Sequence, residues 1–247
     1  MELQPPSLPQ ELVDSVIDHL HDCPGTLVVC ALVHRSWLPS ARHHLFSNIF
    51  FGSKTKCGLF RLSIITNPSL IYLIRTVSVH AVINDFYSAL KDVTFFNLQH
   101  FEISDVSVSS IPQLHFVLAR CMPNLVSMEF TNCFWIDVTV FDRLFQNVSA
   151  RFRSVSLQRI YVSPDGDNAT AMNRLAVPQR RHRMESLVLG HSNVLDWIFH
   201  PRSSLDFRSL KELELTREFH ILETILPYIT RTLEHLSITG SMGTTFV

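Results

Sequence analysis

The first forty residues carry apolar positions spaced with the period of an amphipathic helix. Between Leu8 and Leu20 the apolar residues recur at intervals of three and four, which places them on one side of a helix. The positions are Leu12, Val13, Val16, Ile17 and Leu20. Pro9 suits the first helical turn because its missing N–H costs nothing there, and Glu11 favours the positive end of the helix dipole. We therefore predict a first helix over this stretch.

A second helix is predicted from Leu27 to about Trp37, after Pro24 and Gly25 stop the first and Thr26 provides an N-cap. Its first two turns are apolar nearly all round, which is typical of a helix buried on several sides. A segment of about forty residues is near the limit below which chains seldom fold unaided. Either it packs on the rest of the protein, or a partner covers one face.

Downstream, the pattern apolar-x-x-apolar-x-apolar recurs eight times at near-regular spacing. The onsets are Phe46, Ile74, Leu98, Leu125, Phe152, Met184, Leu210 and Leu233. Alternation over the last three residues of each match is typical of a strand. A period in the twenties with this signature indicates leucine-rich repeats.

The segments between these matches support helices. Apolar stripes occur within 111–121, 140–148 and 222–229, so strand and helix alternate. This order predicts parallel strands on one face and helices on the other, in an arc-shaped solenoid. The asparagine usual in such repeats is absent from every unit, with only Cys133 a familiar substitute, so the repeats are irregular. An ordinary α/β domain with buried strands stays open as an alternative.

The predicted fold is therefore α/β, with an N-terminal three-helix module over 1–45. A leucine-rich-repeat-like solenoid follows over 46–247, with its parallel β-sheet on the concave face. The last repeat begins at Leu233, and no polar capping element follows Ile238. A truncated array, an open end covered by a partner and a poorly functioning gene copy all remain open.

The concave face of such a solenoid is lined by the strand residues that alternate with the buried ones. These are small, polar and mildly acidic, and they include no aromatic anchor of the kind that tight protein contacts use. The candidate substrate-binding residues are His80, His100, Glu102, Glu129, Gln158, Glu212, Glu214 and His235. A weakly basic peptide or a modified tail would suit this face better than a flat apolar partner.

Composition excludes several function classes. The chain has 247 residues, and 21 Lys and Arg oppose 22 Asp and Glu, for a net charge of -1. This balance gives no general attraction to nucleic acid or anionic membrane. The longest apolar run, 27–33, is far shorter than the roughly 20 residues that span a bilayer. The N-terminus lacks the features of a signal peptide, so we expect a cytoplasmic or nuclear protein without nucleic-acid or membrane partners.

The sequence offers no chemistry of its own. Five cysteines are scattered and never spaced CxxC, so we expect reduced thiols, mostly buried. No GxSxG elbow, P-loop, GxGxxG or HExxH is found, and the histidines show no metal-ligand spacing. We therefore predict a non-catalytic protein with no cofactor and no metal. The basic run 180–183 could bind an acidic partner or act as a nuclear import signal, but such runs are more often solvated loop ends.

The N-terminal pattern resembles the F-box motif, and the trailing "LPSARHHLF" is similar to its fungal form. The matching positions are Leu8, Pro9, Glu11, Leu12, Val13, Val16, Ile17, Leu20, Thr26, Leu27, Ala31, Leu32, Val33, Arg35 and Trp37. Two departures are modest: the turn between the helices is about two residues longer than usual, and His34 stands where a cysteine is frequent.

The resemblance implies a substrate-recognition adaptor of an SCF (Skp–cullin–F-box) ubiquitin ligase. One face of the module would pack internally, and the other would dock on the Skp linker subunit and through it on cullin. The implied Skp contacts are Leu8, Pro9, Leu12, Val16, Ile17, Leu20, Leu27, Val33 and Trp37. The repeat domain would hold an unidentified protein substrate.

Two alternatives stay open. The chain could bind Skp without directing ubiquitination, as a scaffold or an inactive copy. It could also be a non-ligase interaction protein whose N-terminal helices cap the following domain and bind no Skp.

Overall fold

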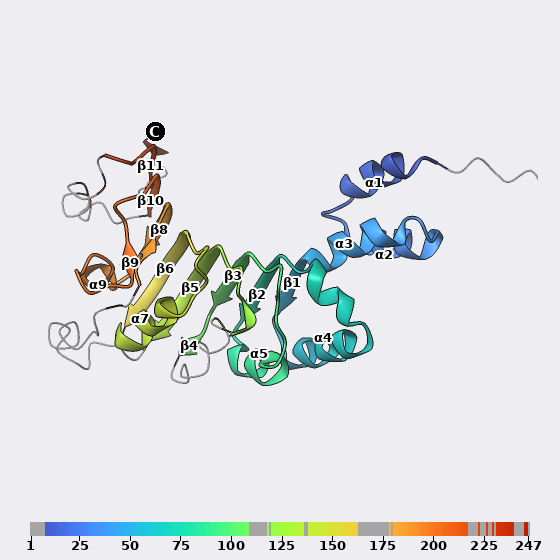
Figure 1. Ribbon diagram of the computed structural model, residues 1–247, viewed down its shortest axis with the longest axis horizontal. Coiled ribbons are helices and arrows are strands. Elements are labelled where there is room, and N and C mark those ends of the chain that lie inside the picture. Colours follow the sequence, from blue (N-terminus) through green and yellow to red (C-terminus); the bar gives the residue numbers. More distant parts are fainter. Residues whose placement is uncertain are drawn as a thin grey trace, which may run out of the picture.

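The chain forms an α/β protein in which three N-terminal helices precede a long, largely parallel β-sheet (Figure 1). The computed structural model describes residues 8–108, 118, 120–135, 138–162, 178, 180–216, 222, 226, 229, 231–239 and 245–246. The predicted α/β class is confirmed at this level.

The N-terminal helices are α1 (Gln10–Asp18), α2 (Pro24–Val33) and α3 (Leu38–Ser47). The second helix differs from its predicted span of Leu27 to about Trp37. It begins at Pro24, because proline is well suited to the first helical position, where no backbone N–H is needed. It ends at Val33, because His34 has extended backbone.

The sheet contains ten strands in the described part of the chain. Its parallel strands are β1 (Asn48–Phe51), β2 (Thr76–His80), β3 (His100–Ser104), β5 (Ser127–Trp135), β6 (Ser154–Val162), β8 (Ser186–Gly190), β10 (Glu212–Thr216) and β11 (His235–Thr239). They follow one another across the sheet in chain order. Each lies where the repeated apolar pattern predicted a strand, so those predictions are confirmed.

Four short strands complete the ladders. They are β4 (Ser107–Val108), β7 (His182–Arg183), β9 (Leu205–Asp206) and β12 (Thr245–Phe246). β4 pairs with the C-terminal half of β5, and β12 runs antiparallel to β11. β7 and β9 form a separate two-stranded parallel sheet.

The side chains of the parallel strands alternate between a buried face and a more open one. In β2, Val77 and Val79 are buried, whereas the side chains between and beside them are not. The register carries this alternation across the sheet, since Val77 pairs with Phe101 and Val79 with Ile103. Buried residues therefore form continuous rows on one face. We call the opposite face the open face.

Helical segments connect the strands. They are α4 (Lys54–Thr66), the 3-10 helix η1 (Pro68–Leu73), α5 (Ile83–Leu90), α7 (Val138–Gln146) and α9 (Leu195–Ile198). Helices α4, α5 and α7 lie along one side of the sheet (Figure 1). Helix α7 confirms the stripe predicted at 140–148. The stripes at 111–121 and 222–229 lie mostly outside the described residues.

A backbone feature repeats directly after the aligned part of each of five strands. Five non-glycine residues have positive φ: Ala81, Asp105, Asn132, Arg159 and His191. Each follows the last open-face position that the register aligns in β2, β3, β5, β6 and β8. The same left-handed turn therefore recurs in successive units, which shows that they share a backbone plan although their sequences differ.

Two separate hydrophobic cores divide the described chain. The smaller joins the N-terminal helices through Val13, Ile17, Leu27, Cys30 and Ala41. The larger runs continuously under the sheet from Phe51 to Ile229. The predicted domain boundary after residue 45 remains a prediction, although α3 continues to Ser47 before β1 begins.

A buried carboxylate ties the later helices together. Asp142 on α7 is fully buried and accepts hydrogen bonds from Trp197 Nε1, Gln146 Nε2 and the backbone and hydroxyl of Ser204. Both carboxyl oxygens thereby have hydrogen-bond partners, as buried polar groups require. This position has a structural role that the sequence pattern did not reveal.

Candidate interaction surfaces

Helix α1 displays three different faces at successive helical positions. Val13 and Ile17 point into the small core, and Ile17 is completely buried. Leu12 and Val16, one position earlier in each turn, are about half exposed. Residues four apart lie on the same face of a helix, so the core pair and the exposed pair form two adjacent apolar stripes.

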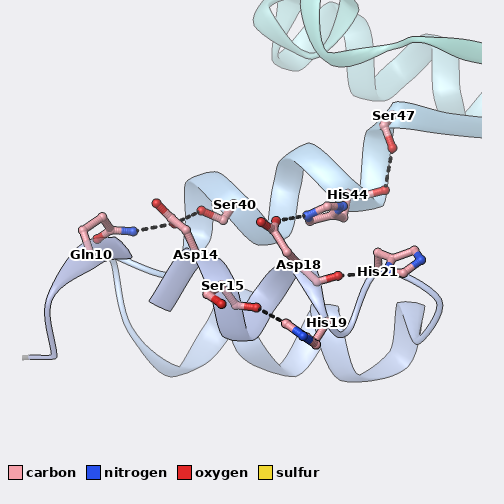
Figure 2. Close-up of polar contacts among 9 residues, drawn as sticks. All are labelled: Gln10, Asp14, Ser15, Asp18, His19, His21, Ser40, His44 and Ser47. Carbon is pink, nitrogen blue, oxygen red and sulfur yellow. Dashed lines mark hydrogen bonds and ion pairs between the residues drawn. The ribbon is translucent and has the colours of Figure 1, made fainter. Parts of the chain in front are cut away.

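The third face of α1 is polar and is bonded to α3 (Figure 2). Ser40 Oγ donates to Asp14 Oδ1, and His44 Nε2 lies 2.7 Å from Asp18 Oδ1. The Ser40 hydroxyl, followed by the Gln10 amide, lowers the pKa of Asp14. These bonds fix the rotation of α1 relative to α3. With that rotation, the exposed apolar stripe lies away from the bonded face.

Helix α2 adds a second exposed apolar row. Leu27 and Cys30 are buried in the small core. Four further apolar side chains on this helix are exposed: Val28, Val29, Leu32 and Val33. Leu32 is 81% exposed, far more than an apolar side chain in a helix that packs on all sides. A three-helix module with an exposed apolar row on each of two helices has the character of a docking surface.

The predicted partner contacts divide into three groups. Leu8, Pro9, Leu12, Val16 and Val33 are exposed. Leu20 and Trp37 are half-buried against the small core. Ile17 and Leu27 are buried within it, where they hold the helices together, and their contact with a partner remains a prediction. Val28, Val29 and Leu32 were missed, because an apolar helix gives no sequence signal for its exposed side.

The open face of the sheet brings polar residues into rows across the strands. Glu102 on β3 is the register partner of Glu129 on β5. Ser78 Oγ donates to Glu102 Oε2 at 2.7 Å. Partial burial, followed by the charge of Glu102, raises the pKa of Glu129, and a hydrogen bond from Thr131 partly offsets this rise. This part of the face is therefore a compact acidic patch.

All the predicted open-face residues lie on that face, but not together. One group lies on β2, β3 and β5, and another on β10 and β11, with Gln158 on β6 between them. In the second group Glu212 is the register partner of His235, and Glu214 that of Ser237. A single compact ligand would not reach both groups, whereas an extended segment lying across the strands would.

Two polar residues at the strand ends, Asp105 and Asn132, were not indicated by the sequence pattern. His80 Nδ1 lies 3.1 Å from Asp105 Oδ2, and Asn132 Nδ2 donates to Asp105 Oδ1. Asp105 and Asn132 occupy the left-handed position after β3 and within β5. The repeated apolar pattern describes only the strand residues. The contacts that link His80, Asp105 and Asn132 across three strands depend instead on the geometry of the turns.

Comparisons with known proteins give no family. No protein-family model matches the chain, and no curated protein matches it.

Within the described part of the chain, no three His, Cys, Asp or Glu side chains gather as a metal site would require. Among the same residues, no helix is both long and apolar enough to cross a bilayer.

Proposed function

We propose that this protein is an F-box-type substrate receptor that docks on a Skp linker through α1 and α2. The observation that carries the proposal is the pair of exposed apolar rows on these helices, with Leu12 and Val16 on α1 and Leu32 and Val33 on α2. Covering such side chains gives roughly 25 cal/mol per Å² of apolar surface removed from water. Their spacing in the sequence also resembles that of the F-box motif.

The sheet region would then be an irregular leucine-rich-repeat solenoid that holds a protein substrate on its open face. Chain-order parallel strands, helices on one side and the repeated left-handed turn all support this assignment. The acidic patch at Glu102 and Glu129 favours a basic segment of the substrate.

The function would be geometric. The N-terminal helices would connect the receptor to Skp and cullin, and the solenoid would present the substrate to a ubiquitin-charged conjugating enzyme. Holding both reactants in one complex raises their effective concentration, so the receptor needs no catalytic residue of its own. Such an adaptor would work in the cytoplasm or nucleus.

Co-expression with a Skp linker protein tests this proposal. The wild type should co-purify with Skp, and Leu12→Asp combined with Val16→Asp should lower the affinity at least about 100-fold, because each unpaired charge buried in an apolar interface costs several kcal/mol. A matched control is Leu59→Asp with Leu62→Asp, which places two charges on exposed apolar positions of α4. This control should retain Skp.

Two results would redirect the proposal. A wild-type protein that stays monomeric and does not bind Skp would make the N-terminal helices a cap of the sheet domain. A complex that retains Skp but never recruits cullin would favour a Skp-binding scaffold that directs no ubiquitination.

A further inference from the structure

A pocket of about 310 Å³ opens beside the small sheet of β7 and β9, between that sheet and the turn after α9. Its inner wall is apolar and buried, formed by Ile198, Leu205 and Phe207. Arg181 and Arg208 also line it, and both are exposed to solvent. The volume is at the lower end of the range for small-ligand sites, and a mostly apolar wall with a few charged groups is their usual composition.

The basic run in the sequence is only partly exposed here. His182 enters β7 and is buried, pairing in register with Leu205. Arg181, just before β7, lines the pocket, whereas Arg183, on β7, does not. Because the third residue of the basic run is buried in a strand, a partner cannot bind all four side chains as one extended signal. The structure instead assigns one of these arginines to the pocket.

The guanidinium of Arg208 is held in a fixed orientation. Its Nε and one Nη donate to the two carboxylate oxygens of Asp206, at 2.9 and 2.7 Å. Five N–H groups project from a guanidinium in a planar fork, so the edge facing away from Asp206 keeps its donors for a second acceptor. Holding the fork in advance lowers the entropy cost of binding such an acceptor.

The charges on the pocket add to one positive unit. Arg181 and Arg208 contribute two positive charges, and Asp206 contributes one negative charge. His200 also lines the pocket, and its Nδ1 accepts from the backbone N–H of Arg202 at 3.1 Å. A ligand with one negative charge balances this set, whereas a dianion would bring its second charge against Asp206.

We propose that this pocket binds a single carboxylate carried on an apolar chain. The carboxylate pairs with the free edge of Arg208 and with Arg181, and the apolar part fills the space against Ile198, Leu205 and Phe207. A planar carboxylate matches a guanidinium edge with two parallel hydrogen bonds. Two sources share this chemistry: a free aliphatic acid, and the C-terminus of a peptide that ends in an apolar residue.

Calorimetric titration of the full chain with octanoate and with octanamide tests the site. The two probes have the same apolar chain, and only octanoate carries the charge. We expect octanoate to bind about tenfold more tightly, because a charge-assisted bidentate pair is lost in the amide. Arg208→Gln and Arg181→Gln should each weaken octanoate about tenfold. Arg208→Lys, which keeps the charge and loses the fork, should lie in between.

Arg183→Gln is the matched control, since Arg183 is exposed on β7, two residues from Arg181, but does not line the pocket. Arg181 and Arg183 are exposed, so their glutamine variants should unfold at the wild-type temperature. Arg208→Gln should unfold at a slightly lower temperature, because the Asp206 carboxylate loses its partner. Equal binding of octanoate and octanamide, an equal loss in Arg183→Gln, or no binding of octanoate would overturn the proposal.

A second pair of probes separates the two sources. The peptide acetyl-Ala-Ala-Leu is compared as the free acid and as the C-terminal amide. Tighter binding of the peptide acid than of octanoate identifies a chain terminus as the ligand, and the reverse identifies a free aliphatic acid. Helix α9 and strand β9, which contribute residues to the pocket, lie at the opposite end of the molecule from α1–α3 (Figure 1), so this test does not depend on Skp docking.

Discussion

Glu102 and Glu129 are direct neighbours on the open face, in register on the parallel strands β3 and β5. Ser78 Oγ donates a hydrogen bond at 2.7 Å to Glu102 Oε2. Burial and then the charge of Glu102 raise the pKa of Glu129. Two like charges on adjacent strands therefore destabilise the folded state at neutral pH. Such a cost in stability is typical of a binding site for a basic partner.

Glu129→Gln should stabilise the free protein at pH 7, by less than about 1 kcal/mol because the side chain is partly exposed to solvent. A carboxyl whose pKa is raised by folding binds more protons in the folded state, so its cost fades as the pH falls towards the unfolded pKa. The stabilisation by Glu129→Gln should therefore disappear in acid. The measurement is thermal unfolding of both proteins as a function of pH.

Glu212→Gln is the control for that comparison, because it removes an open-face charge whose register partners are Ser186 and His235 rather than another acid. If both substitutions change stability equally at every pH, the pairing of Glu102 with Glu129 has no special effect.

The two apolar faces of the N-terminal module should respond differently to truncation. Ile17→Ala removes a fully buried side chain and should cost about 2–5 kcal/mol of unfolding free energy. Leu32→Ala removes an exposed one and should change stability by less than about 0.5 kcal/mol. Chemical denaturation in the absence of any partner measures both. A large cost for Leu32→Ala would show that α2 packs against the rest of the chain.

Acidification should destabilise the region around β7. Burial, and to a lesser degree the cationic Arg180, lower the pKa of His182 to about 4 from its ordinary 6.5. The unfolded state then binds more protons between these two values, so stability falls as the pH drops from 6.5 to 4, by at most about 3 kcal/mol.

His182→Leu should remove this part of the pH dependence, because leucine cannot be protonated. Unfolding by denaturant at several pH values measures the slope. His200→Leu, at a half-buried position lining the pocket, is the control and should leave most of the slope in place. An unchanged slope in His182→Leu would place the acid-sensitive group elsewhere.

Thiol labelling should single out one cysteine. Cys23 is exposed, whereas Cys30, Cys57, Cys121 and Cys133 are buried. Burial raises the pKa of Cys57 and Cys121, and that of Cys133 to about 11, so little reactive thiolate forms there. A thiol reagent at pH 8 should modify one site quickly and the others only on unfolding. Cys23→Ser should abolish the fast phase; a fast phase that persists would locate an accessible thiol elsewhere.

The strands could be predicted well because their burial has a short period. Val77 and Val79 point to one face and Ser78 to the other, and such alternation is visible in the sequence. The same argument put Glu102 and Glu129 on the open face. It could not show that they are neighbours, because the register between strands depends on the length and packing of the connecting segment.

The N-terminal helices show which side chains the sequence could assign to a face and which it could not. Helix α1 alternates apolar and polar residues, so Asp14 and Asp18 could be assigned to a separate polar face. Helix α2 is apolar nearly all round, so its sequence could not say that Leu27 is buried and Leu32 exposed. Only packing against α1 and α3 decides which side faces inwards.

The sequence by itself therefore determined the eight main parallel strands, the buried rows of the sheet and the presence of two apolar helices at the N-terminus. These follow from local periodicity, because a residue four along a helix or two along a strand returns to the same face. The tertiary structure alone decided which apolar side chains remain outside the small core, and it alone brought Arg181, Asp206 and Arg208 around one pocket. Contacts between residues far apart in the chain depend on how the elements pack, and no local pattern encodes that packing.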